Sequence, residues 1–463
     1  MSRMARTSRG DGAPLARFGP AKVRAALAAR AARGSLAAPA ALAGLAVAFA
    51  MGAPRAANAA TIALTGGTVH TVSGPTIQNG TVVIRDGKIA AVGANLQPPP
   101  DAQVVPCNGK HVYPGMIAAN TILGLTEIES VRGTDDATET GNLNPNIRAE
   151  VEINPESDLL PVARVNGITS AVVIPRGGAI AGTAALIHLV GWTYEDMTQK
   201  APLGLYVQWP GMTARTDELR KTRDQAVDAI RQAFLDARAY WKARDAEGSR
   251  AIPRHDRDVK WDAMGRALRG EIPVMFAASA ANQIRAVLDF ADEIGLSRIV
   301  LVDGYDAWRF ADELKSRHVS VIAGPILPGP GRRDEPYDQR YTIAAKLQAA
   351  GIPFCISDGG GSWNSRNLPY CAAMAAAFGL PRDEALKSVT LYPAQILGVS
   401  DRVGSIEVGK VADLFVADGD PLEIATHIEQ VWIDGEKVSM STRQTRLFEK
   451  YDAKPRGPAA RKR

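Results

Sequence analysis

The chain has 463 residues, of which 46% are hydrophobic and 22% charged, a composition that excludes a long disordered or collagen-like chain. Its length allows one large domain and a smaller one. The formal net charge of +5 comes from residues 1–59, which hold 9 of the 54 Lys and Arg but one of the 49 Asp and Glu. The remainder carries 45 basic and 48 acidic residues, a net charge of about −3, so its charge gives no reason to expect a nucleic-acid partner.

The first 59 residues have the three parts of a secretory signal. A basic region over residues 1–34 precedes the apolar run "SLAAPAALAGLAVAFAMG", and small residues follow at Ala57 and Ala59. We expect residues 1–59 to be a signal peptide cleaved after Ala59, which leaves a periplasmic or secreted protein with no stable membrane insertion. The alternative is an uncleaved membrane anchor, because the apolar run is barely long enough to span a bilayer.

Short strands separated by turns are predicted at both ends of the mature chain. Asn79-Gly80, Asp86-Gly87 and Asp434-Gly435 are typical of β-hairpins. We interpret 60–113 and 401–442 as one composite β-sandwich domain, and 443–463 as a basic C-terminal tail with a frayed terminus. Three cysteines far apart in sequence give no disulfide framework and are expected to be small buried hydrophobes.

The middle of the chain, residues 114–400, alternates strands and helices. "ITSAVVI" is a continuous apolar strand, residues 217–247 have helical apolar spacing, and four strand–helix units follow from "IPVMFAAS" onward. A Gly-rich loop is expected over 175–186. The repeats predict an α/β fold, a (β/α)8 TIM-like barrel, whose active site lies at the C-terminal ends of the strands.

Three stretches together resemble the amidohydrolase superfamily, in its imidazolonepropionase-like branch with a composite sandwich domain. They are "GGTVHTVSGPTIQNGTVVIRDGKIAAVG", "HVYPGMIAANTILGL" and "LKSVTLYPAQILGVSDRVGSIEVGKVADLFVADGDPLE". The last stretch is the most specific, because it joins a Pro-Ala helix start to a Gly-Ser-Ile-Glu-x-Gly-Lys return to the sandwich. The resemblance implies a hydrolase of non-peptide C–N bonds, such as those of cyclic amides.

The resemblance also implies a site for zinc or another divalent metal, which lowers the pKa of a bound water. The family's His-x-His on the first barrel strand falls on Asn120 and Ile122. Its fifth-strand His falls near Ala277–Ala278 and its sixth-strand His at Asp303. The fourth-strand ligand would lie near "LYVQWP", which has no Lys or Glu. The eighth-strand Asp, which takes the proton of the water, is retained as Asp358.

None of the six histidines lies at a predicted strand end facing the barrel mouth. His188 is the one nearest to the barrel, and we expect it to be structurally bonded. We therefore predict no metal ligand and no cofactor.

Seven residues are candidates for the site. Asp358 and Asp303 are the candidate catalytic residues, because two nearby carboxylates can divide into an acid and a base. They could also hold a hard cation such as Ca²⁺ or Mg²⁺, or Asp358 could simply cap the Gly-rich loop that follows it. The candidate substrate-binding residues lie on the first strand and on the two Gly-rich loops: Asn120, Arg176, Trp363, Arg366 and Asn367.

Three functions remain open from the sequence. The first is an exported amidohydrolase-family hydrolase acting on cyclic amides or similar substrates. The second is a catalytically inactive barrel that binds a small molecule or a partner protein in the periplasm. The third is an enzyme that uses Asp358 and Asp303 without a transition metal. A small-molecule substrate or ligand is expected in each reading except that of a partner-binding barrel, and the sequence leaves a homo-oligomer open.

Overall fold

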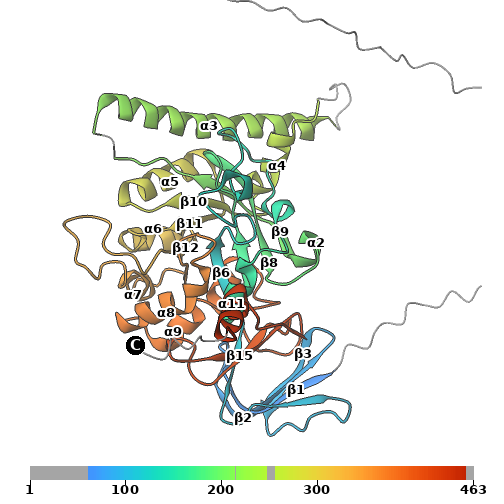
Figure 1. Ribbon diagram of the computed structural model, residues 1–463. Coiled ribbons are helices and arrows are strands. Elements are labelled where there is room, and N and C mark those ends of the chain that lie inside the picture. Colours follow the sequence, from blue (N-terminus) through green and yellow to red (C-terminus); the bar gives the residue numbers. More distant parts are fainter. Residues whose placement is uncertain (1–60, 214, 248–255, 455–463) are drawn as a thin grey trace, which may run out of the picture. The chain divides into compact units, whose positions relative to one another are not determined.

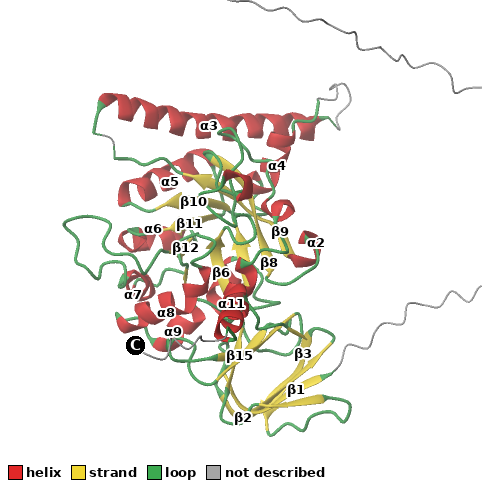
Figure 2. Ribbon diagram, viewed as in Figure 1, coloured by secondary structure: helices red, strands yellow, loops and turns green. Residues whose placement is uncertain are grey.

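The computed structural model describes residues 61–213, 215–247 and 256–454. Of the two units into which the chain divides, Met1–Arg55 and Ala56–Arg463, only the second contains described residues. The expected signal peptide, residues 1–59, lies outside the described residues and stays a prediction. The strands of the described residues form two eight-stranded sheets (Figures 1 and 2).

The first sheet is built from both ends of the described chain. Its strands are hydrogen-bonded in the order β16-β15-β14-β5-β1-β2-β3, with β4 beside β1. The antiparallel pair β5·β14 joins the early strands to the late ones. The strands are β1 Ile62–Val69, β2 Ile77–Arg85, β3 Lys88–Ala94, β4 Gln103–Pro106, β5 His111–Pro114, β14 Leu414–Ala417, β15 Ile428–Ile433 and β16 Glu436–Lys437.

Two of the three predicted hairpin turns are confirmed. Asp86-Gly87 joins β2 to β3 and Asp434-Gly435 joins β15 to β16, and all four residues have positive φ, as a type I′ turn requires. The prediction for Asn79-Gly80 is wrong, because this pair lies inside β2. There Asn79 has a φ of 48° and the register with β1 shifts, so the pair forms a bulge and does not reverse the chain.

The first sheet curls until its two hairpin turns meet. The Ala412 amide donates to the Gly87 carbonyl at 2.8 Å, and the Gly435 amide donates to the Ala412 carbonyl at 3.2 Å. The curled sheet encloses its own hydrophobic core, which agrees with the expected sandwich built from both chain ends. Its buried side chains include Leu64, Val82, Ile84, Val112, Leu414 and Trp432.

The second sheet confirms the predicted barrel class, with one strand reversed. Its strands follow chain order, β6 to β13, and neighbours are parallel except where β8 pairs antiparallel with β7 and β9. They are β6 Met116–Thr121, β7 Ile168–Val173, β8 Ile180–His188, β9 Thr198–Gln208, β10 Val274–Ala278, β11 Ile299–Asp303, β12 Ser320–Ala323 and β13 Phe354–Ile356.

The reversal of β8 corrects the expected Gly-rich loop over residues 175–186. Only residues 174–179 connect β7 to β8, and from Ile180 the chain is strand. So short a connection can join antiparallel strands, whereas parallel neighbours need a crossover of a dozen residues or more.

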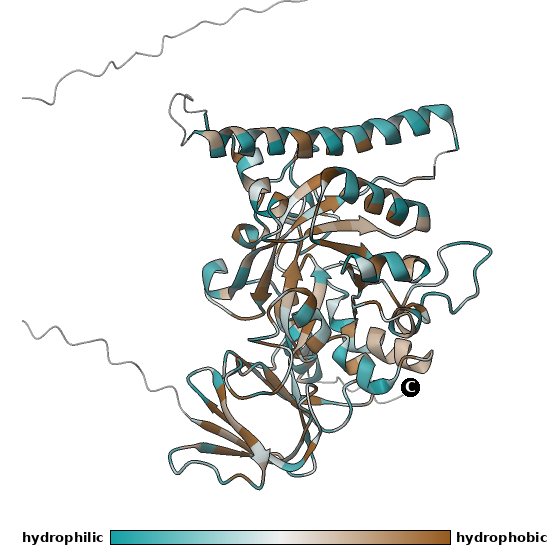
Figure 3. Ribbon diagram, turned by 180° about the vertical axis from the view of Figure 1, so that it is seen from behind, coloured by the Kyte–Doolittle hydropathy of each residue, from teal (hydrophilic) through white to brown (hydrophobic). Residues whose placement is uncertain are grey.

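Helices pack around the second sheet. The longest, α3, has 30 residues and is capped by Thr216, whose side chain accepts from the Leu219 amide. It buries Ile230 and Phe234 as the sequence spacing predicts, while most of its surface is hydrophilic (Figure 3). The helices are α1 Leu159–Arg164, α2 Tyr194–Met197, α3 Asp217–Ala246, α4 Val259–Leu268, α5 Ala281–Ile294, α6 Ala311–Ser316, α7 Ile343–Ala349, α8 Leu368–Ala377, α9 Arg382–Lys387, α10 Leu391–Ile396 and α11 Arg443–Asp452. Short 3-10 helices are η1 Arg132–Thr134, η2 Ala149–Glu152, η3 Ala307–Phe310 and η4 Ser365–Asn367.

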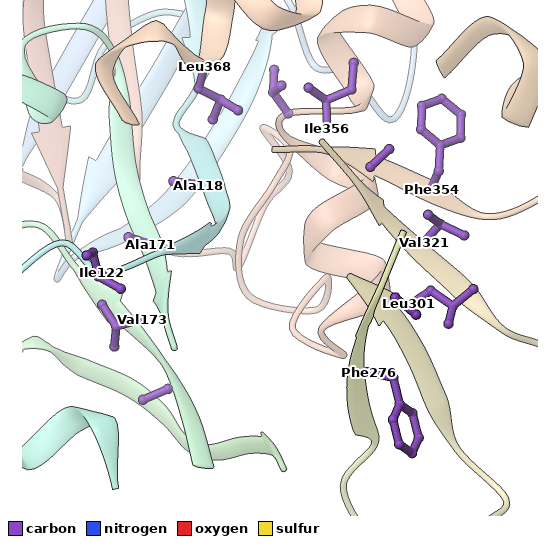
Figure 4. Packing of buried hydrophobic residues seen from close by; sticks show 14 of the residues in the cluster. Ala118, Ile122, Ala171, Val173, Phe276, Leu301, Val321, Phe354, Ile356 and Leu368 are labelled. Carbon is purple, nitrogen blue, oxygen red and sulfur yellow. The ribbon is translucent and has the colours of Figure 1, made fainter. Parts of the chain in front are cut away.

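The barrel strands alternate between two apolar layers. One layer lies inside the barrel and contains Ile117, Val172, Met275, Val302 and Cys355. The other lies between the strands and the helices and contains Ala118, Ala171, Val173, Phe276, Leu301 and Phe354 (Figure 4). The three cysteines are free and buried, as expected.

The edge strands β6 and β13 are joined through the segment between α9 and α10. The Ile117 amide donates to the Val389 carbonyl at 2.9 Å, and the Ile356 amide donates to the Ser388 carbonyl at 3.0 Å. This seam makes the second sheet a nearly closed barrel.

The C-terminal stretch departs from the expected frayed tail. Thr442 caps helix α11 by accepting from the Thr445 amide, so residues 443–452 are helical. Residues 455–463 lie outside the described part of the chain. Among the described residues, no helix combines the length and the apolar character needed to cross a membrane.

His188 is a structurally bonded histidine, as expected. Because β8 is reversed, its last residue lies beside Ser170 near the start of β7, at the end of the barrel opposite the strand C-termini. His188 Nε2 is 3.2 Å from Asp413 Oδ2, and both side chains are buried. Asp413 Oδ1 also accepts from the Asp434 amide at 2.9 Å. The ion pair thus ties the barrel to the first sheet.

The His188–Asp413 pair predicts a pH-dependent stability. Burial lowers the pKa of His188, but the charge and hydrogen bond of Asp413, with a contribution from Asp434, outweigh burial and the opposing Arg402, so the pKa is raised. A raised histidine pKa stabilises the fold below the unfolded pKa, and the contribution is lost as pH rises through the folded pKa. We expect His188→Gln to lower the free energy of unfolding by about 2–4 kcal/mol at about pH 6, and by less at about pH 9, in urea unfolding.

His427→Gln is the matched control, because His427 forms an exposed pair with Asp418 at 3.1 Å. We expect it to change stability little, since exposed pairs contribute little. Equal losses in the two variants, or a His188→Gln loss that grows with pH, would contradict the assignment.

Candidate active site

Four of the predicted site residues meet at the barrel mouth, the end of the second sheet where the parallel strands finish. Asn120 lies on β6, Arg176 follows β7, Asp303 ends β11 and Asp358 follows β13. A fifth side chain, Tyr206 of β9, joins them. We call these five residues the mouth cluster.

Arg176 connects the members of the mouth cluster. Its Nη1 donates to Tyr206 Oη at 2.7 Å, and its Nη2 donates to Asn120 Oδ1 at 2.6 Å and to the Gly360 carbonyl at 3.4 Å. The guanidinium carbon also lies 5.2 Å from the centre of the Tyr206 ring, a cation–π distance. A guanidinium has more N–H donors than these bonds use, so Arg176 keeps donors for a ligand.

Tyr206 was missed in the sequence because the expected ligand there was a charged residue. Alternation along β9 places Tyr206 and Gln208 on the inner face, and Tyr206 Oη donates to Gln208 Oε1 at 3.3 Å. Tyr206 and Gln208 are polar residues two positions apart at the end of an apolar strand, and this pattern could have identified both as inward-facing.

Asp358 is a buried carboxyl group with one free oxygen. Its Oδ1 has no hydrogen-bond partner among the described residues, whereas Oδ2 accepts from Ser365 Oγ at 3.5 Å. Burial raises the pKa of Asp358 to about 7, although hydrogen bonds from its own backbone amide and from Ser365, and the positive charge of Arg176, act in the opposite direction. The carboxyl group is therefore poised to exchange a proton near neutral pH.

Asp303 is held in a strained backbone conformation at the end of β11. Its φ is 75°, in the left-handed region that few residues other than Gly, Asn and Asp enter. Burial raises its pKa, and the charges of Arg176 and Arg340 oppose that rise. Strain of this kind is often found at functional sites, which agrees with a role for Asp303 at the mouth.

The Gly-rich loop after β13 lies against Arg176. The Gly361 carbonyl accepts from Thr121 Oγ1 at 2.9 Å and from Ser365 Oγ at 3.1 Å, which fixes the loop to β6. A Cβ on Gly360 would lie 2.3 Å from Arg176 Nη2, so only glycine allows this approach.

The three other predicted binding residues lie outside the mouth cluster. Trp363 is 53% exposed on the Gly-rich loop. Arg366 and Asn367 line a separate cavity of about 330 Å³ together with residues next to α1 and α11. The Arg366 carbonyl accepts from Asn166 Nδ2 at 2.5 Å, so this segment packs on α1's side of the barrel.

Ile122 does not face the mouth, although the sequence alignment to a His-x-His strand pairs it with Asn120. It packs in the apolar layer between strands and helices, beside Ala171 and Val173 (Figure 4). The register between β6 and β7 shifts between Ala118 and Thr121, and this irregularity breaks the alternation that would turn both positions inward. Within the described ranges, no group of three or more His, Cys, Asp or Glu side chains could hold a metal ion.

The close approach at Gly360 generates a stability prediction. We expect Gly360→Ala to lower the free energy of unfolding by about 1–3 kcal/mol, because its φ of 90° strains any L side chain and the Cβ meets Arg176. Gly93→Ala is the control, because a Cβ there has no atom within 4 Å. Equal melting temperatures for Gly360→Ala and the unmodified protein would show that Gly360 does not lie this close to Arg176 in solution.

Comparison with known proteins identifies similar chains. The amidohydrolase family model matches residues 338–439. The amidohydrolase tasK of Hapsidospora irregularis is 26% identical over 393 residues, which are 77% of this chain but 39% of tasK. An imidazolonepropionase of Syntrophobacter fumaroxidans is 23% identical over 395 residues, 76% of this chain and 87% of that enzyme.

The solved structures extend the likeness to the fold. The amidohydrolase of Thermotoga maritima MSB8 superposes with a TM-score of 0.75 and 28% identity, over 82% of this chain and 99% of that one. The barrel with its second sheet, the sequence relatives and this structural match lead to one conclusion: the chain belongs to the amidohydrolase superfamily.

Proposed function

We propose that this chain hydrolyses non-peptide carbon–nitrogen bonds, with cyclic amides as the substrate class, and that it does so at the mouth cluster. The observation that carries the proposal is Asp358 Oδ1, a buried oxygen without a hydrogen-bond partner among the described residues. Buried polar atoms are almost always paired, so a free carboxylate oxygen at a barrel mouth supports a water or substrate atom as its partner. The pKa of about 7 suits a group that takes and returns a proton.

The proposed reaction needs only a proton transfer and a stabilised oxyanion. Ionised Asp358 accepts a proton from water, and the resulting hydroxide adds to the carbonyl carbon of the amide. The unused N–H groups of Arg176 stabilise the negative oxygen. The C–N bond then breaks, and the nitrogen takes the proton from Asp358. A cyclic amide opens to one product with a carboxylic acid and an amine, which become a carboxylate and an ammonium by proton exchange with water. Asp303, whose pKa is also raised, is the second acid or base candidate.

The relatives support the bond type. They are an amidohydrolase and an imidazolonepropionase, and the amidohydrolase fold is shared. Because the chain spans 39% of tasK, the activity of that whole protein is no more than a guide.

The proposal includes no divalent metal, because the residues at the family's ligand positions do not suit one. Asn120 Oδ1 already accepts from Arg176, Ile122 is an alkyl group in an apolar layer, and Ala277 has no donor atom. Structural and catalytic zinc sites need three or four nitrogen, sulfur or oxygen ligands that converge.

A catalytically inactive small-molecule binder is the second candidate. Asn120, Tyr206 and the Gly360 carbonyl engage much of the donor capacity of Arg176, which favours a rigid binding surface. Such a barrel would show ligand-induced stabilisation without turnover. For either function we propose a periplasmic or secreted location, which the signal-like sequence of residues 1–59 supports.

The test is a turnover assay on a panel of cyclic amides, with nucleobases and dipeptides as comparison classes. We expect ring opening of a cyclic amide, with kcat/KM reduced about 10²–10⁴-fold in Asp358→Asn because the base is lost. Since Asp358 must be ionised, kcat/KM should fall as pH drops below about 7 and level off above it.

Asp401→Asn is the control, because Asp401 is an exposed aspartate outside the mouth. Asp303→Asn shows the contribution of the second mouth carboxylate. The pH profiles of kcat/KM in Asp303→Asn and Asp358→Asn identify which carboxylate is the base. Melting-temperature shifts by a cyclic amide with no ring opening in any variant would favour the binding function and reject hydrolysis.

A further inference from the structure

Two carboxyl groups at one barrel end, the partly buried Asp303 and the buried Asp358, create a charge problem. Asp303 ends β11 and Asp358 follows β13, the next strand but one, and burial raises the pKa of both. Buried ionised groups are costly unless a counter-charge lies nearby. In amidohydrolases of the type this sequence resembles, a divalent metal supplies positive charge at the mouth.

In this chain the cation that acts on both carboxyl groups is Arg176. Its charge opposes the pKa rise of Asp303 and of Asp358 alike. Arg340 also acts on Asp303. Its guanidinium donates to the Gly329 carbonyl at 2.8 Å and to the Pro325 carbonyl at 3.4 Å, and it lies over the Tyr305 ring at 4.8 Å.

The guanidinium of Arg176 is fixed by oxygen atoms from separate segments of the barrel. Asn120 Oδ1 comes from β6, Tyr206 Oη from β9 and the Gly360 carbonyl from the loop after β13. The Arg176 amide donates to the Ala137 carbonyl at 2.7 Å, which anchors the base of the side chain. The cation is therefore held from several sides of the mouth, and Asn120 stands where the family has a metal-ligating histidine.

We propose that the guanidinium of Arg176 is the permanent cation of this barrel mouth and replaces a divalent metal as the charge partner of Asp303 and Asp358. This extends the proposed function by naming the group that makes it metal-independent, but it rests on the contacts of Arg176 and not on turnover. A second, divalent cation at the same place would be repelled by the fixed charge.

The first test measures metal in the full-length purified protein. We expect substoichiometric metal by mass spectrometry, and an unchanged melting temperature after EDTA treatment or after addition of Zn²⁺, Mn²⁺, Mg²⁺ or Ca²⁺. Stoichiometric metal, a melting temperature that falls with EDTA, or one that rises with any of these ions would overturn the proposal, because a bound ion stabilises the folded state.

The second test separates charge from packing with four variants. Arg176→Met should lower the melting temperature by about 4–10 °C, Arg176→Lys should lower it less, and Arg366→Met, at an exposed arginine, should leave it unchanged. At about pH 9, above the pKa of about 7 that Asp358 has in the unmodified protein, the double variant Arg176→Met/Asp358→Asn should melt above Arg176→Met, because it removes a buried charge that has lost its counter-charge. Equal losses in Arg176→Lys and Arg176→Met, or no recovery in the double variant, would contradict the cation role.

The two tests remain informative if Arg176→Met does not fold, since the metal and EDTA measurements use the unmodified protein. They also separate this inference from the proposed function. A protein without turnover but with metal-free, Arg176-dependent stability would reject hydrolysis and keep the cation role. Turnover together with stoichiometric metal would reject the cation role of Arg176 and keep hydrolysis.

Discussion

The hydrogen bonds of Arg176 join parts of the barrel that the chain builds at widely separated points. One side chain, from the short loop after β7, reaches β6, β9 and the loop after β13. Glycine at position 360 is required for this reach, and the Thr121 and Ser365 hydroxyls hold the same loop in place. Polar contacts from three parts of the mouth therefore meet at a single guanidinium, whose charge also acts on both carboxyl groups.

The barrel and its composite partner sheet could be predicted because their signals are local and repeated. Continuous apolar strands, helical spacing and Asp-Gly turns are each visible within a few residues of sequence. The segment around Pro393 resembles the closing segment of a known family, which fixed the order of the strands. The reversal of β8 could not be predicted from this pattern. A buried strand is apolar in either direction, so only the length of its connection to β7 reveals which way it runs.

What the sequence left open at the site has the same physical origin. Asp303 and Asp358 were placed by counting strands, and both lie at the mouth. The packing of Ile122 away from the mouth could not be predicted, because a register irregularity within β6 interrupts alternation and a sequence shows a bulge only weakly. Arg176 was predicted to bind substrate, and the structure places it at the mouth. Its acceptors are protein oxygens from other strands, and such long-range partners are set by the closed fold and not by neighbouring residues.

The composite sheet has a consequence for the order of assembly. Strands β1 to β5 are made first, yet their neighbour β14 begins at Leu414, and the seam between β6 and β13 is joined through Ser388 and Val389. Neither sheet can be completed until the last sixth or so of the polypeptide is available. Contacts between such distant segments form slowly, because a long loop must close first. During synthesis the early strands therefore have an unpaired edge for most of the time that the chain is growing, and a chain cut short before β14 would keep that edge exposed.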